Sequence, residues 1–203
     1  MPIRGKLISE ISPADIFELI KQQTPEDECL DFKKEILDPR KPTTRLEKDK
    51  EDWVTDLVAF ANGLGGHIII GLEADHQERA FRLNPMMEDQ AKKLADTLRD
   101  LAIAWVKPHI SPLVISSFQI AAEEWIVIAR VPDSQDKPHM CNYGDRTRFT
   151  IRTGNRKREM MYDEIRNFFL GALQEQRMVR LLSEVESISL RLADLERGLR
   201  KVE

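Results

Sequence analysis

The sequence has few cysteines and histidines, and this scarcity excludes several common kinds of site. Only two cysteines and four histidines occur among the 203 residues. Cys29 and Cys141 are too far apart to match a zinc-binding motif, so a metal site built from cysteine and histidine is not expected. Two unpaired thiols are typical of a protein in a reducing compartment, and the sequence therefore predicts a cytoplasmic protein.

The sequence also lacks long apolar runs and an excess of basic charge. No stretch of about 18 apolar residues occurs, so no membrane span is expected. The N-terminal stretch MPIRGKLISEI has no apolar segment of the kind that a signal peptide contains. The net charge of −4 argues against a protein that coats nucleic acid through its overall charge. This total nevertheless conceals a basic segment between Arg146 and Arg158.

Hydrophobic periodicity predicts an α+β domain. Helices are predicted at residues 12–23, 44–62 and 87–106. Strands are predicted near residues 30–33, 67–73, 113–120, 125–131 and 147–152. Ser12 is the expected N-cap of the first helix, and Thr44 with Glu47 resembles a capping box at the second. Short links between strands, with helices between groups of them, indicate a mixed, mostly antiparallel sheet with flanking helices.

The C-terminal segment carries a heptad repeat. Apolar residues recur at alternating steps of three and four, at Met178, Leu181, Val185, Ile188, Leu192, Leu195, Leu199 and Val202. This spacing is typical of a coiled coil, and Arg191 and Glu196 occupy g and e positions that suit an ion pair between parallel helices. A long helix packed on its own domain is the alternative. The predicted organisation is a domain at 1–170 and a helix at 171–203 that forms a homo-oligomer.

The stretch PEDECLDFKKEI places carboxylates and lysines on a predicted strand. Leu30 and Phe32 would enter the core, while Asp31 and Lys33 would project from the opposite face. Metal-dependent nucleases use such a pair, because the carboxylate binds Mg²⁺ or Mn²⁺ and the ammonium stabilises the phosphate. Glu26, just before the strand, could add a ligand. A solvated sheet edge is the alternative, because an acid and a lysine at this spacing are common.

The segment AFANGLGGHIIIGLEAD ends a predicted helix and begins a buried strand. Gly63, Gly65 and Gly66 allow the abrupt turn between them. A dinucleotide site would need a strand before the glycines and a helix after them, so the reverse order found here excludes one. The strand would deliver Glu73 or Asp75 as a third carboxylate at its far end.

The segment RTRFTIRTGNRKREMM is rich in arginine. Its candidate nucleic-acid-binding side chains are Arg148, Arg152, Arg156, Lys157 and Arg158. On a strand, Arg148 and Arg152 would share a face opposite Phe149 and Ile151, and this face would suit a phosphate backbone. A solvated strand face is the alternative. His139, in the preceding loop, is either a proton-transfer group at the nucleic-acid site or an ordinary loop histidine.

Four motifs, taken in order, resemble those of the Schlafen/AlbA_2 family. They are E-x4-(E/D)-F-K at 26–33, A-F-A-N-x-x-G-G with a following I-G-(V/L) at 59–72, S-x-x-x-P-H at 134–139, and (F/Y)-x-I-R-x-G-N with a following M at 149–160. The resemblance covers roughly residues 12–170. It implies a nucleic-acid-binding protein, and the Schlafen members of the family include ribonucleases that act on tRNA and rRNA.

The resemblance also implies a site of three carboxylates. In the Schlafen ribonucleases, two acids belong to the first motif and the third lies just beyond the I-G-V strand. The matching residues here are Glu26, Asp31 and Asp75, with Glu73 as the second choice for the third acid. Asp31 stands where the family has glutamate, so its side chain is one methylene shorter. With Lys33, these residues would hold Mg or Mn.

Three functions are compatible with these patterns. The first is a metal-dependent endoribonuclease that acts on structured RNA such as tRNA, with the basic segment positioning the RNA. The second is a non-catalytic DNA- or RNA-binding regulatory module that oligomerises through its C-terminal helix. The third is a scaffold subunit that docks a partner effector in a bacterial defence complex. Nucleic acid is the expected partner, and RNA is favoured over DNA.

Overall fold

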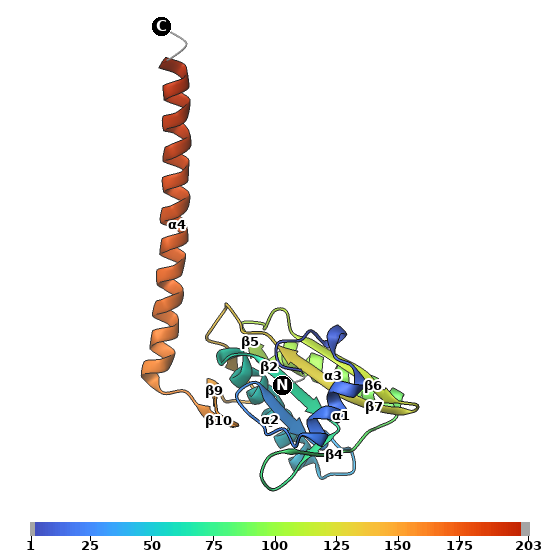
Figure 1. Ribbon diagram of the computed structural model, residues 1–203. Coiled ribbons are helices and arrows are strands. Elements are labelled where there is room, and N and C mark those ends of the chain that lie inside the picture. The colour runs from blue at the N-terminus through green and yellow to red at the C-terminus, as the bar shows by residue number, and fades with distance from the viewer. Residues whose placement is uncertain (1–2, 200–203) are drawn as a thin grey trace. The chain divides into compact units, whose positions relative to one another are not determined.

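The computed structural model describes residues 3–199, with side chains for all of these except 175–176 and 190–199. The chain divides into two units, the first ending at Met161 and the second beginning at Tyr162 (Figure 1). The predicted α+β class is confirmed, because helices flank a mixed sheet and a long helix follows. The coiled coil stays a prediction. None of the helices within residues 3–199 combines the length and apolar character that a membrane crossing requires.

The elements have the following bounds. The helices of the first unit are the 3-10 helix η1 (Ile8–Glu10), α1 (Pro13–Lys21), α2 (Thr43–Asn62) and α3 (Glu88–Trp105). Its strands are β1 (Leu30–Lys33), β2 (Gly66–Ile70), β3 (Leu72–Ala74), β4 (Ala80–Leu83), β5 (Val106–Lys107), β6 (Val114–Ala121), β7 (Glu124–Val131), β8 (Met140–Cys141), β9 (Thr150–Thr153) and β10 (Arg156–Glu159). The second unit contains the helix α4 (Tyr162–Leu199).

The predicted helix caps are right at α1 and wrong at α2. The Ser12 hydroxyl accepts a hydrogen bond from the backbone of Asp15, whose carboxylate accepts one in return from the backbone of Ser12. The second helix begins directly after Pro42, which offers no side-chain acceptor. The predicted capping box of Thr44 and Glu47 therefore does not form, because the helix starts before Thr44.

The central sheet has the strand order β1-β2-β7-β6, so β1 lies at an edge. β1 runs parallel to β2, whereas β7 is antiparallel to both β2 and β6. In the β1–β2 register, Asp31 lies beside Ile68 and Lys33 beside Ile70. Because side chains of paired residues project from the same face, Asp31 and Lys33 share a face with two core isoleucines.

Both faces of the sheet are covered by apolar packing. Ile68 and Ile70 pack with α2 and α3 on one face, while Ile69 packs with α1 on the other. The indole N–H of Trp53 donates to the carbonyl of Leu98 at 3.0 Å and so ties α2 to α3 inside the first of these layers. Asp31 and Lys33 consequently point toward α2, and the solvated-edge alternative does not describe them.

Candidate functional site

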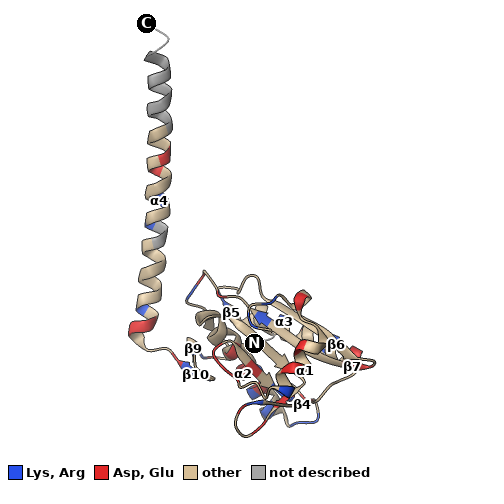
Figure 2. Ribbon diagram, viewed as in Figure 1, with Lys and Arg blue, Asp and Glu red and all other residues tan. Residues whose placement is uncertain are grey.

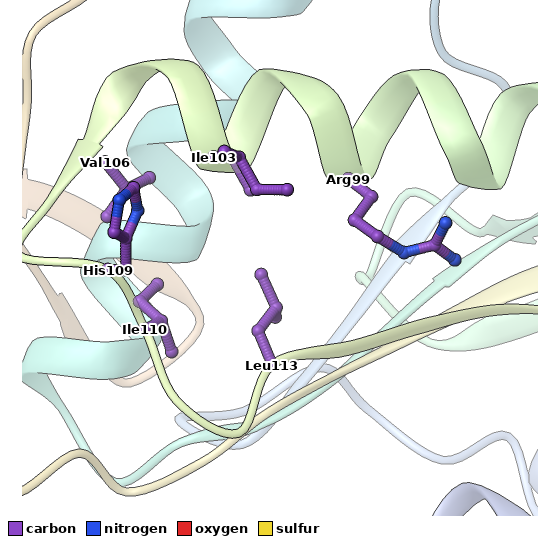
Figure 3. A pocket seen from close by; sticks show the side chains of 7 residues that line it. Arg99, Ile103, Val106, His109, Ile110 and Leu113 are labelled. Carbon is purple, nitrogen blue, oxygen red and sulfur yellow. The ribbon is translucent and has the colours of Figure 1, made fainter.

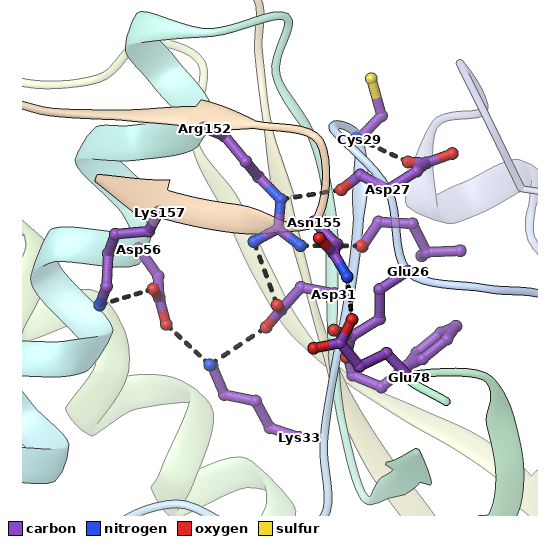
Figure 4. A network of polar contacts seen from close by, with 12 residues as sticks. Glu26, Asp27, Cys29, Asp31, Lys33, Asp56, Glu78, Arg152, Asn155 and Lys157 are labelled. Carbon is purple, nitrogen blue, oxygen red and sulfur yellow. Dashed lines mark hydrogen bonds and ion pairs between the residues drawn. The ribbon is translucent and has the colours of Figure 1, made fainter. Parts of the chain in front are cut away.

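Lys33 lies at the centre of a buried ion network (Figure 4). The network consists of Glu26, Asp31, Lys33, Asp56, Arg152 and Lys157. The Lys33 ammonium is 2.7 Å from one oxygen of Asp56 and 3.1 Å from one oxygen of Asp31. Burial alone would lower the pKa of Lys33, but the charges of Asp56 and Asp31 outweigh it and raise that pKa above its ordinary value. Lys33 is therefore a fixed cation.

Asp56 connects the network to a second lysine. Its side chain lies on α2 and is 7% exposed. The Lys157 ammonium is 2.7 Å from the other Asp56 oxygen, donates to the Thr55 hydroxyl at 2.7 Å, and donates to the Asp52 carbonyl at 3.2 Å. Burial would raise the pKa of Asp56, but Lys33 and Lys157 hold it below its ordinary value. The carboxylate is thus ionised between ammonium groups from β1 and β10.

Arg152 holds Asp31 from the opposite side. Its guanidinium donates to Asp31 at 3.1 Å and to the carbonyls of Asp27 and Leu30 at 2.8 and 3.1 Å. It also lies over the ring of Phe60, 4.5 Å from the centroid. The side chain is only 3% exposed. Arg152 therefore fastens β9 to β1 and is not on the surface where the strand pattern places it.

The inward direction of Arg152 reverses the predicted orientation of β9. Thr150 and Arg152 lie on the buried face of the strand, whereas Ile151 is only half-buried. The predicted outward-facing row of Arg148 and Arg152 is therefore wrong. Arg148 lies outside β9 and pairs with Glu51 at 2.9 Å.

The other predicted basic residues belong to β10, which forms a hairpin with β9. Arg156 is exposed, while Lys157 and Arg158 are half-buried. The Arg158 guanidinium donates to the Thr153 hydroxyl at 3.2 Å. Acidic and basic residues are interspersed along the elements of the first unit (Figure 2). Exposed positive charge at the hairpin is accordingly more limited than the sequence pattern predicts.

Glu26 and Asp31 are the two predicted acids that the fold brings together. The backbone N–H of Phe32 donates to Glu26 at 2.9 Å. Burial, and then the negative charge of Asp31, raise the pKa of Glu26 to about 7. Asp31 Oδ2 is buried and accepts no hydrogen bond from any described residue, although the Lys33 ammonium forms an ion pair with it at 3.1 Å. Two carboxylates in this arrangement attract a proton or a cation.

Glu73 and Asp75, the two choices for the third acid, have partners of their own. Arg79 lies 2.8 Å from Asp75. Its hydrogen bonds lower the pKa of Asp75 to about 2. Glu73 forms ion pairs with Arg82 at 2.5 Å and with Lys34 at 3.3 Å. Each of these carboxylates is balanced by a cation on or near its own strand.

The predicted metal ligands do not assemble into one site in this structure. Among the described residues, no group of three or more aspartate, glutamate, histidine or cysteine side chains is placed to hold a metal ion. Asp31 is already paired with Lys33 and Arg152, so cations of the chain itself occupy the position next to it. As arranged, the donor set does not fit Mg²⁺ or Mn²⁺, and the metal site stays a prediction.

His139 lies inside a buried hydrogen-bonded cluster. Its ring contacts the Ser134 hydroxyl at 2.6 Å and the Pro108 carbonyl at 2.8 Å, and burial lowers its pKa. Its backbone N–H donates to the Asn62 side chain at 2.7 Å. Asn62 in turn donates to the carbonyls of His139 and Thr150, both at 2.9 Å. With an exposure of 0%, His139 fastens its loop to the end of α2 and is not placed to contact nucleic acid.

Asp56 is a site residue that the sequence analysis did not single out. It follows Trp53 by three positions and precedes Phe60 by four, so all three lie on one side of α2. A single acid within the apolar stretch WVTDLVAFAN is the feature that could have identified it. A charge at a core-facing helix position needs an opposite charge nearby, which here comes from two lysines.

A cavity of about 230 Å³ lies between α3 and the loop that follows β5 (Figure 3). It is lined by Arg99, Ala102, Ile103, Val106, His109, Ile110 and Leu113. The Arg99 guanidinium is held by the Ile115 carbonyl at 2.7 Å and by Asp96 at 2.7 Å. None of the predicted site residues lines this cavity, so it does not contribute to the ion network.

Replacing Glu26 with glutamine is expected to stabilise the protein at pH 8 and to have little effect at pH 4. The folded-state pKa of about 7 lies above the ordinary 4.5, so the folded protein binds more protons than the unfolded chain between these values. The associated stability is fully present below pH 4.5 and is lost as the pH rises through 7. The glutamine side chain stays neutral at both pH values, so the gain is about 2 kcal/mol after allowance for partial exposure. Urea unfolding of the wild type and Glu26→Gln at the two pH values measures this gain. Free energies of unfolding that change equally with pH in the two proteins would contradict the prediction.

Two solved structures resemble parts of this chain at low identity. The crystal structure of the DIP2311 protein from Corynebacterium diphtheriae has a TM-score of 0.45 and 15% identity, covering 72% of this chain and 26% of that one. The solution structure of the N-terminal domain of a protein related to the ATP-dependent DNA helicase RecG, from Nitrosomonas europaea, has a TM-score of 0.42 and 15% identity, covering 75% of this chain and 96% of that one. No curated protein matches the sequence. The model of the family described as Schlafen, AlbA_2 matches residues 26–161, and this chain belongs to that family.

Proposed function

We propose that the chain binds nucleic acid, RNA in preference to DNA, at the sheet edge where β1 meets the β9–β10 hairpin. Membership of the Schlafen AlbA_2 family indicates a nucleic-acid-related function. The observation that carries the proposed location is the Lys33 ammonium, which is held between two carboxylates while its side chain remains 22% exposed. Arg156 is exposed on the adjoining hairpin and would add a second phosphate contact.

The charge distribution favours a few positioned phosphate contacts over a broad basic surface. The net charge is −4, and acidic and basic residues are interspersed over the first unit (Figure 2). Phosphate contacts fix the register of a nucleic acid without reading its sequence. Double-stranded and folded RNA is recognised largely by shape and by contacts to phosphate and 2′-hydroxyl groups, which suits this arrangement.

Salt-dependent binding of a fluorescein-labelled RNA stem-loop, followed by fluorescence anisotropy, tests the proposal. Affinity should fall steeply with salt, and Lys33→Ala should bind about tenfold more weakly with a salt slope smaller by about one. Lys92→Ala is the matched control, because Lys92 forms an ordinary surface pair with Glu88 at 2.6 Å on α3. Unchanged binding by Lys33→Ala would reject the location. A wild-type protein that binds neither the stem-loop nor duplex DNA would reject the function.

A Mg- or Mn-dependent endoribonuclease acting on structured RNA such as tRNA is the second candidate function. The proximity of Glu26 and Asp31 favours it, because these two carboxylates would be the ligands that hold the cation. Incubation of a tRNA pool with either metal tests it, with Glu26→Gln as the variant that keeps an acceptor for the Phe32 N–H. Cleavage that disappears in Glu26→Gln supports the candidate, and absence of cleavage by the wild type with both metals rejects it.

We also propose that α4 pairs with a second copy of the chain as a parallel coiled coil. The seam residues with described side chains are Met178, Leu181, Val185 and Ile188, which are 56–59% exposed. The predicted seam residues Leu192, Leu195 and Leu199 lie outside the residues whose side chains are described. An apolar seam of this length is stable only when a partner helix covers it.

Sedimentation equilibrium of the purified chain tests the pairing. Ile188→Glu should shift the protein toward the monomer, whereas Ser183→Glu, at an outer heptad position, should not. A wild type that is monomeric at every concentration would contradict the coiled coil. Purification from the native host with a different protein at fixed stoichiometry would favour the scaffold function instead.

A further inference from the structure

We propose that Asp56 and Lys157 are positioning residues for Lys33 and that together they direct its ammonium toward a bound phosphate. This inference rests on the proposed nucleic-acid binding at Lys33. It assigns an indirect role to Lys157, which the sequence pattern places among the direct nucleic-acid contacts. The support comes from the hydrogen-bond partners of the two lysines, their exposure and the charge of the network (Figure 4).

The two lysines differ in the donors that they have left for a ligand. A lysine ammonium has three N–H donors. Lys157 has four acceptors inside the protein: an Asp56 oxygen at 2.7 Å, the Thr55 hydroxyl at 2.7 Å, the Asp52 carbonyl at 3.2 Å and the Asp52 carboxylate at 3.5 Å. Lys33 has the Asp56 oxygen at 2.7 Å and an ion pair with Asp31 at 3.1 Å, so at most two of its N–H groups are used. One N–H of Lys33 is therefore available for a phosphate oxygen, whereas the donors of Lys157 are already used.

Asp56 fixes the position of the Lys33 ammonium. A lysine side chain on a surface samples many rotamers, and ordering it on binding costs free energy. The Asp56 carboxylate, 7% exposed on α2, holds the ammonium from one side while Asp31 holds it from the strand itself. Lys34, the next residue, provides the contrast, because it pairs only at longer range with Glu73, at 3.3 Å, and its side chain is 44% exposed.

Lys157 compensates the negative charge of Asp31 and Asp56, the two carboxylates that hold the Lys33 ammonium. Asp31 and Asp56 together would turn the surroundings of Lys33 negative and would repel a phosphate. Lys157 and Arg152 compensate them. With Asp52, whose carboxylate is 3.5 Å from Lys157, three cations face three carboxylates, before the charge that Glu26 adds when it is ionised. Arg152 is 3% exposed, whereas Lys33 and Lys157 are 22% and 25% exposed, so the positive charge of the network meets solvent at the two lysines. Of these two, Lys33 is the one with an N–H left for a ligand.

The test combines amine labelling of the free protein with RNA binding. The variants are Asp56→Asn, Lys157→Met and the double variant Asp56→Asn/Lys157→Met. The double variant removes one charge of each sign, so it is expected to fold even if an unpaired buried charge unfolds the single variants. Acetylation by an amine-reactive reagent, read by mass spectrometry of the peptides, should be about tenfold faster at Lys33 in Asp56→Asn and in the double variant, because the Asp56 carboxylate 2.7 Å away no longer holds the amine. Labelling of Lys92, the matched control, should be unchanged.

The RNA stem-loop should bind about tenfold more weakly to the double variant than to the wild type, as it does to Lys33→Ala. Adding Lys33→Ala to the double variant should cause no further loss, because positioning has no effect once Lys33 is absent. Lys33 labelling at the wild-type rate in every variant would overturn the positioning role, whatever the protein binds. Wild-type RNA affinity in the double variant would overturn its effect on the ligand. Faster Lys33 labelling in a chain that never binds nucleic acid would reject the proposed function and retain the positioning of Lys33.

Discussion

Replacing Arg152 with alanine is expected to lower the free energy of unfolding by about 4 kcal/mol. The change removes three hydrogen bonds, to Asp31 and to the carbonyls of Asp27 and Leu30, and the contact with the ring of Phe60. It also leaves Asp31 buried with Lys33 as its remaining close cation. Urea denaturation followed by circular dichroism measures the loss.

Two further variants separate this role from a general sensitivity of the hairpin. Arg156→Ala, at the exposed position on β10, should change the stability by less than about 0.5 kcal/mol. Arg152→Lys should recover only part of the loss, because one ammonium cannot bond an aspartate and two carbonyls in the fork geometry of a guanidinium. Equal losses in Arg152→Ala and Arg156→Ala would show that Arg152 is not the residue that fastens β9 to β1.

Local patterns predicted the three α-helices and the central strands of the first unit, because the residues concerned act within their own segment. The short strands β4, β5, β8 and β10 were not predicted. The alternation of Leu30 and Phe32 with Asp31 and Lys33 correctly places the first two in the core and the other two on the opposite face. The segment itself does not indicate what packs against the face that carries Asp31 and Lys33. Whether it lies against solvent or a helix depends on α2, which the chain reaches only later.

The orientation of β9 was mispredicted for a related reason. Alternation predicts that apolar residues point inward and arginine outward, and Arg152 breaks this rule. A buried arginine is favourable only when its donors find acceptors, and these are supplied by the segment from Asp27 to Asp31, far away in the sequence. Asp56 could not be predicted for the same reason, because its partners Lys33 and Lys157 are distant from it in the sequence.

The ion network joins the first and the last of the four sequence motifs. The first motif supplies Glu26, Asp31 and Lys33, and the last supplies Arg152. Arg152 pairs with Asp31 of the first motif, and Lys33 pairs with Asp31 and with Asp56 on α2, so removing Arg152 or Lys33 takes a cation from a buried carboxylate. The sequence analysis predicts catalysis for Glu26, Asp31 and Lys33 and nucleic-acid binding for Arg152. The observed contacts of Asp31, Lys33 and Arg152 hold β1, α2 and the hairpin together.

Replacing Gly66 with alanine is expected to lower the free energy of unfolding by more than about 4 kcal/mol. Single substitutions rarely cost this much, and a clash with the backbone is a cause that can do so. Gly66 has a φ of +141°, and an added Cβ would lie 2.1 Å from the carbonyl oxygen of Cys29. That carbonyl accepts the N–H of His67 at 2.8 Å at the start of the β1–β2 pairing. The clash is with backbone, so β1 would have to move, and the ion network with it.

Gly154→Ala is the matched control, because Gly154 also has a positive φ, +61°, but an added Cβ would meet nothing within 4 Å. It should cost about 1 kcal/mol, the strain of a left-handed residue without a clash. Thermal unfolding of both variants, with Lys33 acetylation as the local readout, separates the two effects. Gly66→Ala should unfold at a much lower temperature and label Lys33 faster even where it is still folded, because displacement of β1 withdraws Lys33 from Asp56. Similar unfolding temperatures for the two variants would mean that the close approach of β2 to Cys29 is not required for the fold, and that the position of β1 does not depend on it.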